Sequence, residues 1–224
     1  MSLLNFSLLG FFFSVFGCTP AIDPNLTTPL SIDNGKEIHF NFEKYSVNQT
    51  PDDWSVALTG KGKMCDWKIL TDNDNKVLAQ VSSETFGYRF NLITNNTISA
   101  KDVDITVRFK AIKGNEDQGG GPVWRYQDAN NYYVARANPL ENNFRLYKVI
   151  DGDRKMLKTS SFKMEANQWY KLRIIMKDNK IQCYFNDKLA MTAIDDSFAS
   201  AGKIGLWSKS DAYTYFDDLN LIVK

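Results

Sequence analysis

Apolar and polar residues alternate with a period of two over most of this chain. The clearest case is DVDITVRFKAI, residues 102–112, in which Val103, Ile105 and Val107 share one face with two further apolar residues. Because successive side chains of a β-strand point to opposite faces, this alternation predicts a strand with one buried face. No segment keeps a helical period over three turns, so we expect an all-β protein.

Short turns separate further strands of this kind. Asp178-Asn179 and Asn186-Asp187 divide residues 169–194 into three apolar runs, and Asp151-Gly152 lies at the tip of another hairpin. Asp, Asn and Gly tolerate the backbone conformations that tight hairpins need. About a dozen strands joined by hairpins predict antiparallel pairing, and a sheet of that size splits into two packed layers. The expected fold is therefore a two-sheet antiparallel jelly-roll sandwich.

The first residues follow a different pattern. The segment MSLLNFSLLGFFFSVFGC has no charged side chain, and its apolar run is short for a membrane span. We interpret residues 1–17 as a secretory signal peptide. The segment ends in Val15-Phe16-Gly17-Cys18, which resembles the box of bacterial lipoproteins, in which the cysteine is lipidated and becomes the new N terminus. Phe16 is bulky for its position and no Lys or Arg precedes the apolar core, so a plain secretory signal and a buried segment stay open.

A polar segment follows Cys18. Residues 18–34 are rich in Pro, Thr and Asn and offer little apolar surface to bury, which is typical of a tether. The predicted organisation is a signal peptide over 1–17, a lipoprotein tether over 18–34 and one sandwich domain over 35–224. Under this prediction the protein is exported to the cell envelope. A lipid on Cys18 holds it on a membrane, facing the periplasm or the cell surface.

Charge and residue types exclude several functions. The chain has 27 basic and 26 acidic residues, which are interspersed, whereas nucleic-acid binding needs a clustered basic excess. His39 is the single histidine, so neither a Ser–His relay nor a histidine-rich zinc site is expected. The run Gly119-Gly120-Gly121 lacks the Lys-Ser/Thr of a phosphate-binding loop and opens no helix. We interpret it as the start of a strand where a neighbour approaches closely.

The two remaining cysteines allow two interpretations. Cys65 and Cys183 could form a disulfide in an exported protein. Pairing requires Cα atoms within about 7 Å of each other, which the sequence does not define. Cys183 shares a strand face with Ile181 and Phe185. This position favours a buried free thiol.

Oxygen-rich segments are candidate calcium sites, because calcium accepts both carboxylate and carbonyl oxygens. The candidates are Asp217 and Asp218, with Glu43 and the pair Asp52-Asp53 as further ligands. In the alternative interpretation, Asp217 and Asp218 accept hydrogen bonds at the closing strand. No cofactor other than a structural calcium is expected.

A group of motifs carries a family resemblance. WSVALTGKGK, DVDITVRFK, VWRYQDANNYYVARANPLENN, GKIGLWSK and YFDDL lie between Phe40 and Val223. Together they resemble the concanavalin A-like lectin/glucanase sandwiches of bacterial exported proteins, related to laminin G-like domains and placed near the 3-keto-disaccharide hydrolases. The resemblance implies two curved, stacked sheets with ligands on the concave face or at the loop rim. It does not define an activity, because this fold hosts lectins, glycosidases, lyases and spacers.

The chain departs from the catalytic members of this group. The hydrolase relatives imply a glycine-rich strand start followed by an aromatic residue and Arg, which Trp124-Arg125 matches. The Asn-Ser-Gly that usually opens this run is replaced by Gln118-Gly119-Gly120. The glucanases of the fold often place carboxylates on one strand face as Glu-x-Asp-x-Glu, and this motif is absent. These departures weigh against the enzyme interpretation.

Aromatic and planar polar side chains carry the remaining functional signal. Sugars have apolar C–H faces and hydroxyl rims, which suit aromatic rings flanked by Arg, Asn and Gln. Alternation predicts that Trp124 and Tyr126 face the core and that Arg125 and Gln127 face a cleft, joined by arginines of neighbouring strands. Clustered arginines repel one another, which favours a polar or acidic saccharide. The candidate carbohydrate-binding residues are Arg125, Gln127, Tyr132, Arg136, Asn138 and Arg145.

Three functions stay open at this point. The first is a lipid-anchored, lectin-like domain that binds a polysaccharide or oligosaccharide through these candidates. The second is a hydrolase or lyase acting on 3-keto-glucosides or related glycans, with Arg125 and an unassigned carboxylate. The third is a structural or adhesion module without a ligand, in which the aromatic residues form the core and the arginines form surface ion pairs.

Overall fold

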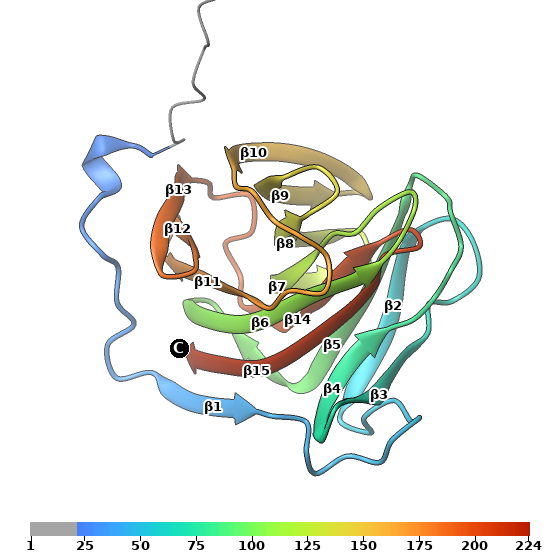
Figure 1. Ribbon diagram of the computed structural model, residues 1–224. Coiled ribbons are helices and arrows are strands. Elements are labelled where there is room, and N and C mark those ends of the chain that lie inside the picture. The colour runs from blue at the N-terminus through green and yellow to red at the C-terminus, as the bar shows by residue number, and fades with distance from the viewer. Residues whose placement is uncertain (1–21) are drawn as a thin grey trace, which may run out of the picture.

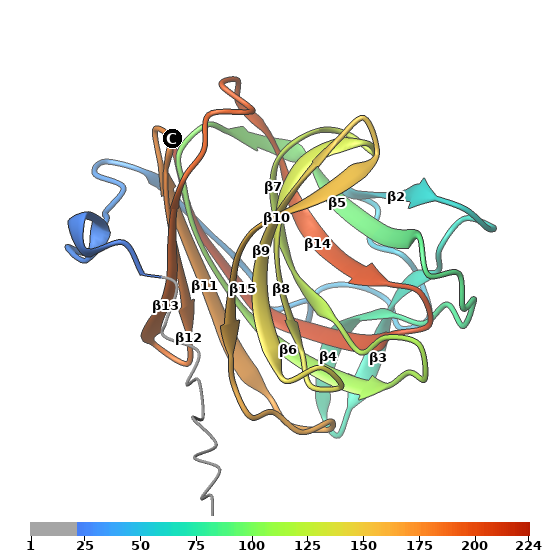
Figure 2. The same ribbon diagram turned by 90° about the horizontal axis from the view of Figure 1, so that it is seen from above.

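The computed structural model describes residues 22–224, which form fifteen strands and one short 3-10 turn, η1 (Pro24–Leu26) (Figure 1). The predicted signal peptide and Cys18 lie outside the described residues. Among residues 22–224 there is no helix with the length and apolar character needed to cross a membrane. All strand pairs are antiparallel, and the strands form two stacked layers (Figure 2). The predicted all-β jelly-roll sandwich is therefore confirmed.

Each layer is one sheet, named here A or B. In order across the sheet, sheet A contains β13 (Lys188–Ile194), β12 (Lys180–Phe185), β11 (Tyr170–Lys177), β6 (Val103–Lys113), β15 (Tyr213–Val223), β4 (Asn75–Gln80) and β3 (Trp67–Asp72), with β1 (Lys36–Phe40) also paired to β15. Sheet B contains β10 (Asp153–Ser161), β9 (Asn143–Ile150), β8 (Asn131–Asn138), β7 (Gly120–Asp128), β14 (Gly202–Lys209), β5 (Arg89–Ala100) and β2 (Trp54–Gly60).

The main hydrophobic core lies between the two sheets. The alternating residues of β6 enter it as predicted, and Val103, Ile105 and Val107 are fully buried. Trp124 of β7 stacks on Tyr133 of β8 with ring centroids 5.6 Å apart. Burying a large apolar side chain of this kind contributes roughly 2 to 3 kcal/mol to folding. The core therefore holds β7 and β8 firmly against sheet A, and this fixes the position of the residues on their other face.

The predicted hairpin turns are present. Asp151, Asp178 and Asn186 have φ angles of 51°, 54° and 45°, a left-handed conformation that Asp and Asn adopt more easily than most residues. Gly152 follows at φ 84°. These turns set the register of the β9–β10, β11–β12 and β12–β13 hairpins.

A second apolar layer covers the face of sheet B that points away from sheet A. It includes Phe90, Tyr132, Tyr147 and Trp207, all nearly inaccessible to solvent. The turns at the ends of β7 and β9 meet β2 and the loop before β5. The Gly152 nitrogen donates to the Asn130 carbonyl at 3.0 Å, and Thr59 and Tyr132 share a hydroxyl hydrogen bond of 2.9 Å. These contacts close one end of the sheet B face, so the sheet is strongly curved.

The N-terminal arm, residues 23–33, lies against sheet A. The Gln182 side chain donates to the carbonyls of Leu26 and Thr28 at 2.7 and 2.8 Å and accepts from the Leu30 nitrogen at 2.8 Å. Leu26 and Ile32 are buried. This part of the predicted tether is a docked segment and not a free spacer, because Gln182 supplies the hydrogen bonds that an extended chain otherwise makes with water.

Both described cysteines are buried free thiols. Cys183 is fully buried in the core between the sheets, beside Ile181 and Phe185, as its strand face predicted. The Cys65 thiol lies 3.1 Å from the Ala57 carbonyl. The disulfide that the sequence left open is not formed.

Candidate functional site

Arg125 and Gln127 do not face a cleft. Arg125 is 1 % exposed, and its guanidinium donates to the carbonyls of Lys101, Phe198 and Asp178 at 2.8, 2.7 and 2.5 Å. Gln127 donates to the Ala201 carbonyl at 3.1 Å. The prediction from strict alternation was wrong here, because Arg125 has a φ of 45° and the β7–β8 register shifts after Trp124. Both side chains hold loops together at one end of the sandwich.

Tyr126 is also placed by this shift, whereas Tyr132 and Asn138 follow the regular alternation of β8. Tyr126 does not enter the core between the sheets; it stacks on Tyr132 in the outer layer of sheet B, with centroids 6.0 Å apart. Tyr132 and Asn138 are fully buried. Asn138 donates to Asp117 at 3.2 Å and accepts from the Leu140 nitrogen at 2.9 Å. Tyr132 and Asn138 therefore support the outer face of sheet B from below and are not positioned for direct ligand contact.

Arg136 and Arg145 are brought together on the outer face of sheet B, where they are direct cross-strand partners. Glu141, in the turn between β8 and β9, contacts both: its Oε2 lies 3.0 Å from Arg136 Nη2 and 2.9 Å from Arg145 Nη1. Arg136 also donates to Asn143 at 3.1 Å. Two of the predicted site residues thus share one carboxylate.

Asp117 extends this network below Arg136. Its carboxylate is fully buried, 3.5 Å from Arg136 Nη1 and 3.0 Å from Lys209 Nζ. A Cβ atom on Gly119 would lie 2.5 Å from Arg136 Cδ and 2.6 Å from an Asp117 oxygen. The glycine run is therefore a strand start that leaves room for the buried Asp117–Arg136 pair, as the close-approach interpretation predicted.

Arg154 completes the group, and the sequence analysis did not identify it. Its guanidinium carbon lies 4.5 Å from the Tyr147 ring centroid, 4.8 Å from that of Phe90 and 5.8 Å from that of Trp207. A cation over aromatic faces is stabilised by about 0.5 to 2 kcal/mol. We name Asp117, Arg136, Glu141, Arg145, Tyr147, Arg154 and Lys209 the arginine cluster.

The surroundings favour the charged form of Glu141 but disfavour the charged form of Arg154. Burial acts to raise the pKa of Glu141, but hydrogen bonds from Arg136 and Asn143 and the charges of Arg136 and Arg145 outweigh it and lower the pKa to about 2. Burial lowers the pKa of Arg154, and the charge of Arg136 acts in the same direction, against the favourable effect of Tyr147. Glu141 is thus a firmly ionised partner, whereas Arg154 carries its charge in an unfavourable environment.

Several buried N–H groups of this region have no hydrogen-bond acceptor within residues 22–224. They are Arg136 Nε and Nη1, Arg145 Nε, Arg154 Nη1 and Trp207 Nε1. Most buried polar groups in proteins are paired, and an unpaired one costs about 1 to 3 kcal/mol. Trp54 Nε1 and Trp67 Nε1 of the main core also lack partners within the described residues, so unpaired donors alone do not define a ligand site.

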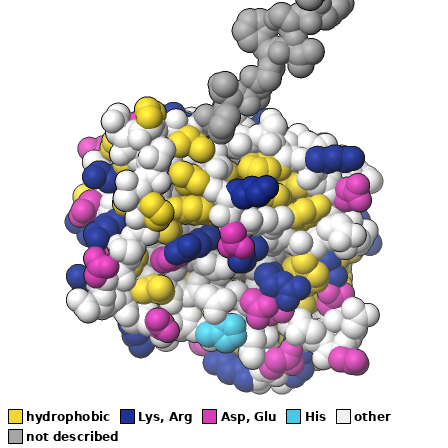
Figure 3. Space-filling view, turned by 60° about the vertical axis from the view of Figure 1, so that its left-hand side comes forward, with side chains coloured by type: hydrophobic (Ala, Val, Ile, Leu, Met, Phe, Trp, Pro, Cys, Tyr) yellow, Lys and Arg dark blue, Asp and Glu magenta, His cyan; other side chains and the backbone are white. Residues whose placement is uncertain are grey.

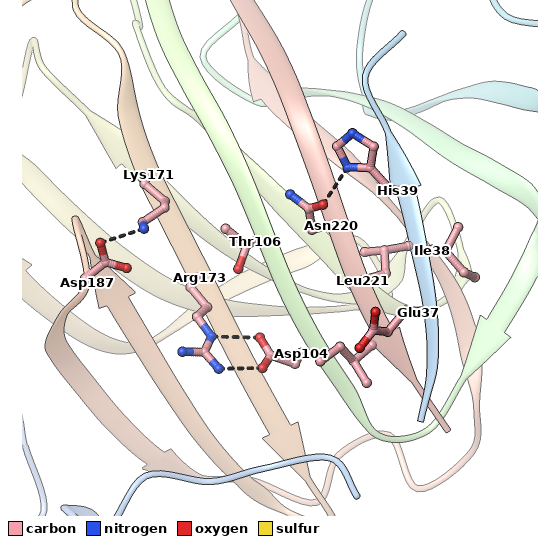
Figure 4. A pocket seen from close by; sticks show the side chains of 11 residues that line it. Glu37, Ile38, His39, Asp104, Thr106, Lys171, Arg173, Asp187, Asn220 and Leu221 are labelled. Atoms are coloured by element: carbon pink, nitrogen blue, oxygen red, sulfur yellow. Dashed lines mark hydrogen bonds and ion pairs between the residues drawn. The ribbon is translucent and has the colours of Figure 1, made fainter. Parts of the chain in front are cut away.

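A hollow lies on the outer face of sheet A. Figure 3 shows this side of the molecule, where charged side chains of both signs are interspersed with apolar ones. The hollow has a volume of about 500 Å³. Figure 4 shows that four of its charged side chains are paired: Arg173 donates to both Asp104 oxygens at 2.9 and 2.6 Å, and Lys171 lies 2.5 Å from Asp187.

His39 lies at the edge of this hollow, where its Nδ1 is 2.5 Å from the Asn220 side-chain oxygen (Figure 4). No acidic residue is placed to form a relay with it among the hydrogen-bond partners that the structure describes. His39 is thus an exposed residue that contacts the neighbouring strand β15.

The candidate calcium ligands Asp217, Asp218 and Glu43 are engaged in other contacts. Asp217 accepts from Asn75 at 2.9 Å and from the Asp218 nitrogen at 2.7 Å, while Asp218 pairs with Arg108 at 3.0 Å. Glu43 accepts from the Lys76 nitrogen. The described residues include no group of three metal-ligating side chains. As arranged, these residues do not fit a calcium site, because Arg108 already neutralises Asp218.

Comparisons with known proteins agree with the fold. Levanase from Bacillus subtilis (strain 168) is 24 % identical over 162 residues, which are 72 % of this chain but 20 % of the enzyme. The carbohydrate binding module CBM66 from Bacillus subtilis superposes with a TM-score of 0.62 at 19 % identity, over 76 % of this chain and 95 % of the module. The β-glucanase of Bacillus licheniformis superposes with a TM-score of 0.57 at 14 % identity, over 85 % of this chain and all of that one.

These similarities confirm the resemblance to concanavalin A-like sandwiches. The chain spans about one fifth of the levanase, so the activity of that whole enzyme does not transfer with the match. Residues 31–222 match a carbohydrate-related family. The chain belongs to the family of 3-keto-alpha-glucoside-1,2-lyase-like domains.

Proposed function

We propose that this protein is a carbohydrate-binding domain that holds its ligand on the outer face of sheet B, over the arginine cluster. The observation that carries the proposal is the partly exposed Arg145–Glu141 pair beside Arg154, whose guanidinium has no ion-pair or hydrogen-bond partner within residues 22–224. A sugar supplies hydroxyl and ring oxygens as acceptors. The similarity to a levanase and to a carbohydrate binding module supports this class of ligand.

The arrangement of the cluster fits this function chemically. Arg145 and Glu141 are each about one-third exposed, so they are accessible at the surface, while Tyr147 and Trp207 form an apolar floor beneath Arg154. Planar guanidinium donors suit the hydroxyl rim of a sugar. Buried Asp117 and Asn138 keep Arg136 in place from below.

An affinity measurement tests this proposal. Affinity electrophoresis and calorimetry with a panel of soluble glycans that includes levan should show binding, and Arg145→Ala should weaken it at least tenfold. Arg173→Ala is the matched control, since Arg173 is similarly exposed and paired but lies on sheet A. Loss of binding in Arg173→Ala with full binding in Arg145→Ala would place the ligand on sheet A. Failure of every glycan to bind would favour the module without a ligand.

The family match also favours a second candidate, an enzyme acting on 3-keto-glucosides. Such a reaction needs a group that accepts a proton, and Glu141 is the accessible carboxylate of the cluster. A carboxylate with a pKa near 2 is a weak base, because a general base works best with a pKa near the working pH. Release of free sugar from a 3-keto-glucoside, lost in Glu141→Gln, would support catalysis over binding alone.

We further propose that the protein is exported and anchored by a lipid on Cys18, as the sequence of residues 15–18 indicates. The docked arm supports a role at a surface, since it holds the chain from Asp23 onward on sheet A, opposite the proposed ligand face. Metabolic labelling with an acyl-chain probe should mark the wild type and not Cys18→Ala. Equal labelling of the two proteins would refute the anchor.

A further inference from the structure

The charges of the arginine cluster do not balance. It contains four cationic side chains and two carboxylates, whereas the whole chain has 27 basic and 26 acidic residues. Asp117 is shared by Arg136 and Lys209, and Glu141 by Arg136 and Arg145. Within the cluster, the cationic side chains therefore outnumber the carboxylates by two.

Arg154 is the least satisfied member of the cluster. Within residues 22–224 its guanidinium forms no ion pair within 4.0 Å and no hydrogen bond, and its Nη1 is buried. Arginines elsewhere have partners: Arg173 is bidentate on Asp104, and Arg125 is held by three carbonyls. The lack of a partner is thus particular to Arg154, since Arg136 and Arg145 of the same cluster are ion-paired.

Tyr147 brings two of the cations to one place. Arg145 Nη1 lies 3.4 Å from the Tyr147 hydroxyl, and the Arg154 guanidinium carbon lies 4.5 Å from the centroid of the same ring. Like charges this close to one aromatic side chain repel each other, more strongly where water is partly excluded. An anion placed beside Tyr147 would interact favourably with both arginines.

From this geometry we infer that the ligand of the site is an anionic saccharide, whose carboxylate or sulfate group is held by Arg145 and Arg154. The inference rests on the proposed carbohydrate-binding function and narrows it to a class of ligand. Arginine suits both groups, because its planar donors form parallel hydrogen bonds with two oxygens of a carboxylate or sulfate. A neutral sugar would leave the charge excess uncompensated.

The test compares ligands that differ only in charge. Calorimetry with the full-length protein uses trigalacturonate and its fully methyl-esterified form, and a second arm uses dextran sulfate and dextran. We expect the charged member of at least one pair to bind at least tenfold more tightly, with an affinity that falls at least fivefold between 50 mM and 500 mM NaCl. The arm that shows the preference identifies carboxylate or sulfate as the bound group.

Variants then locate the bound charge. Arg154→Gln and Arg145→Gln should each remove most of the preference for the charged ligand, Arg154→Lys should retain part of it, and Arg173→Gln should leave it unchanged. Equal affinity for charged and neutral members of both pairs would overturn the inference while leaving carbohydrate binding intact. Absence of binding to these ligands and to levan would overturn both. The comparison of charged and neutral ligands on the wild-type protein tests the inference even if a variant fails to fold.

Discussion

Arg145 and Glu141 form an ion pair of 2.9 Å at the surface end of a network that continues inward to a fully buried carboxylate. The same Glu141 oxygen contacts Arg136, which in turn contacts Asp117. The partly exposed pair therefore helps to orient a completely buried arginine, together with Asn143 and Asp117.

The first prediction concerns acid stability. The pKa of Glu141 is lowered to about 2, so its ionised form stabilises the folded state above about pH 4.5, and this contribution is lost as the pH falls toward 2. Discounted for partial exposure, Glu141→Gln should cost about 1 to 2 kcal/mol at pH 7. The cost should vanish near pH 2. Urea unfolding at pH 7, 4.5 and 2.5 measures it.

The control for this prediction is Glu165→Gln, which changes an exposed carboxylate outside the cluster. Its stability should follow that of the wild type over the same pH range. A Glu141→Gln protein that loses the same free energy of unfolding at pH 2.5 as at pH 7 would show that the effect is steric and not electrostatic.

The second prediction concerns Arg125. Arg125→Ala removes the donors that pair three loop carbonyls, so we expect a loss of about 3 to 5 kcal/mol, or roughly 10 °C in melting temperature. Glycan binding measured at low temperature should not change, since Arg125 lies outside the arginine cluster. A folded variant of wild-type stability that cannot bind glycan would instead restore Arg125 as a ligand-binding residue.

Much of the fold could be predicted from local patterns, and the site only in part. The alternation in β6 and the Asp and Asn turns could be predicted because they depend only on residues that are adjacent in the sequence. The direction of the Arg125 side chain was predicted wrongly because Arg125 itself has a positive φ, which reverses the alternation that follows it. No composition rule locates such a residue within a strand that otherwise alternates.

The network around Arg136 combines residues from separate strands and loops, so its partners depend on tertiary pairing. Arg154 is a partial exception. It follows the predicted Asp151-Gly152 turn, and a two-residue hairpin places it opposite Val149, on the face of Tyr147. Extending the predicted hairpin register by one pair would have identified it.

The third prediction concerns the thiols. Burial raises the pKa of both Cys65 and Cys183, so neither forms the reactive thiolate in the folded protein. In a Cys18→Ala background, Ellman's reagent should leave the native protein unlabelled and should titrate both thiols after denaturation without reductant. A melting temperature lowered by reductant would instead reveal a disulfide that this structure does not contain.

The fourth prediction concerns the arm docked on sheet A. Gln182 is fully buried and its amide contacts backbone groups of Leu26, Thr28 and Leu30. Gln182→Ala removes these contacts and leaves buried backbone groups unpaired, which should cost about 2 kcal/mol. The arm should then detach more often, so thermolysin should cleave within residues 23–33 several times faster than in the wild type.

The control is Gln168→Ala, which makes the same substitution at an exposed glutamine. This variant should be cleaved at the wild-type rate. Glycan binding should survive in both variants, because the arm and the arginine cluster lie on different sheets. Unchanged cleavage in Gln182→Ala would mean that Leu26 and Ile32 hold the arm by apolar contact alone.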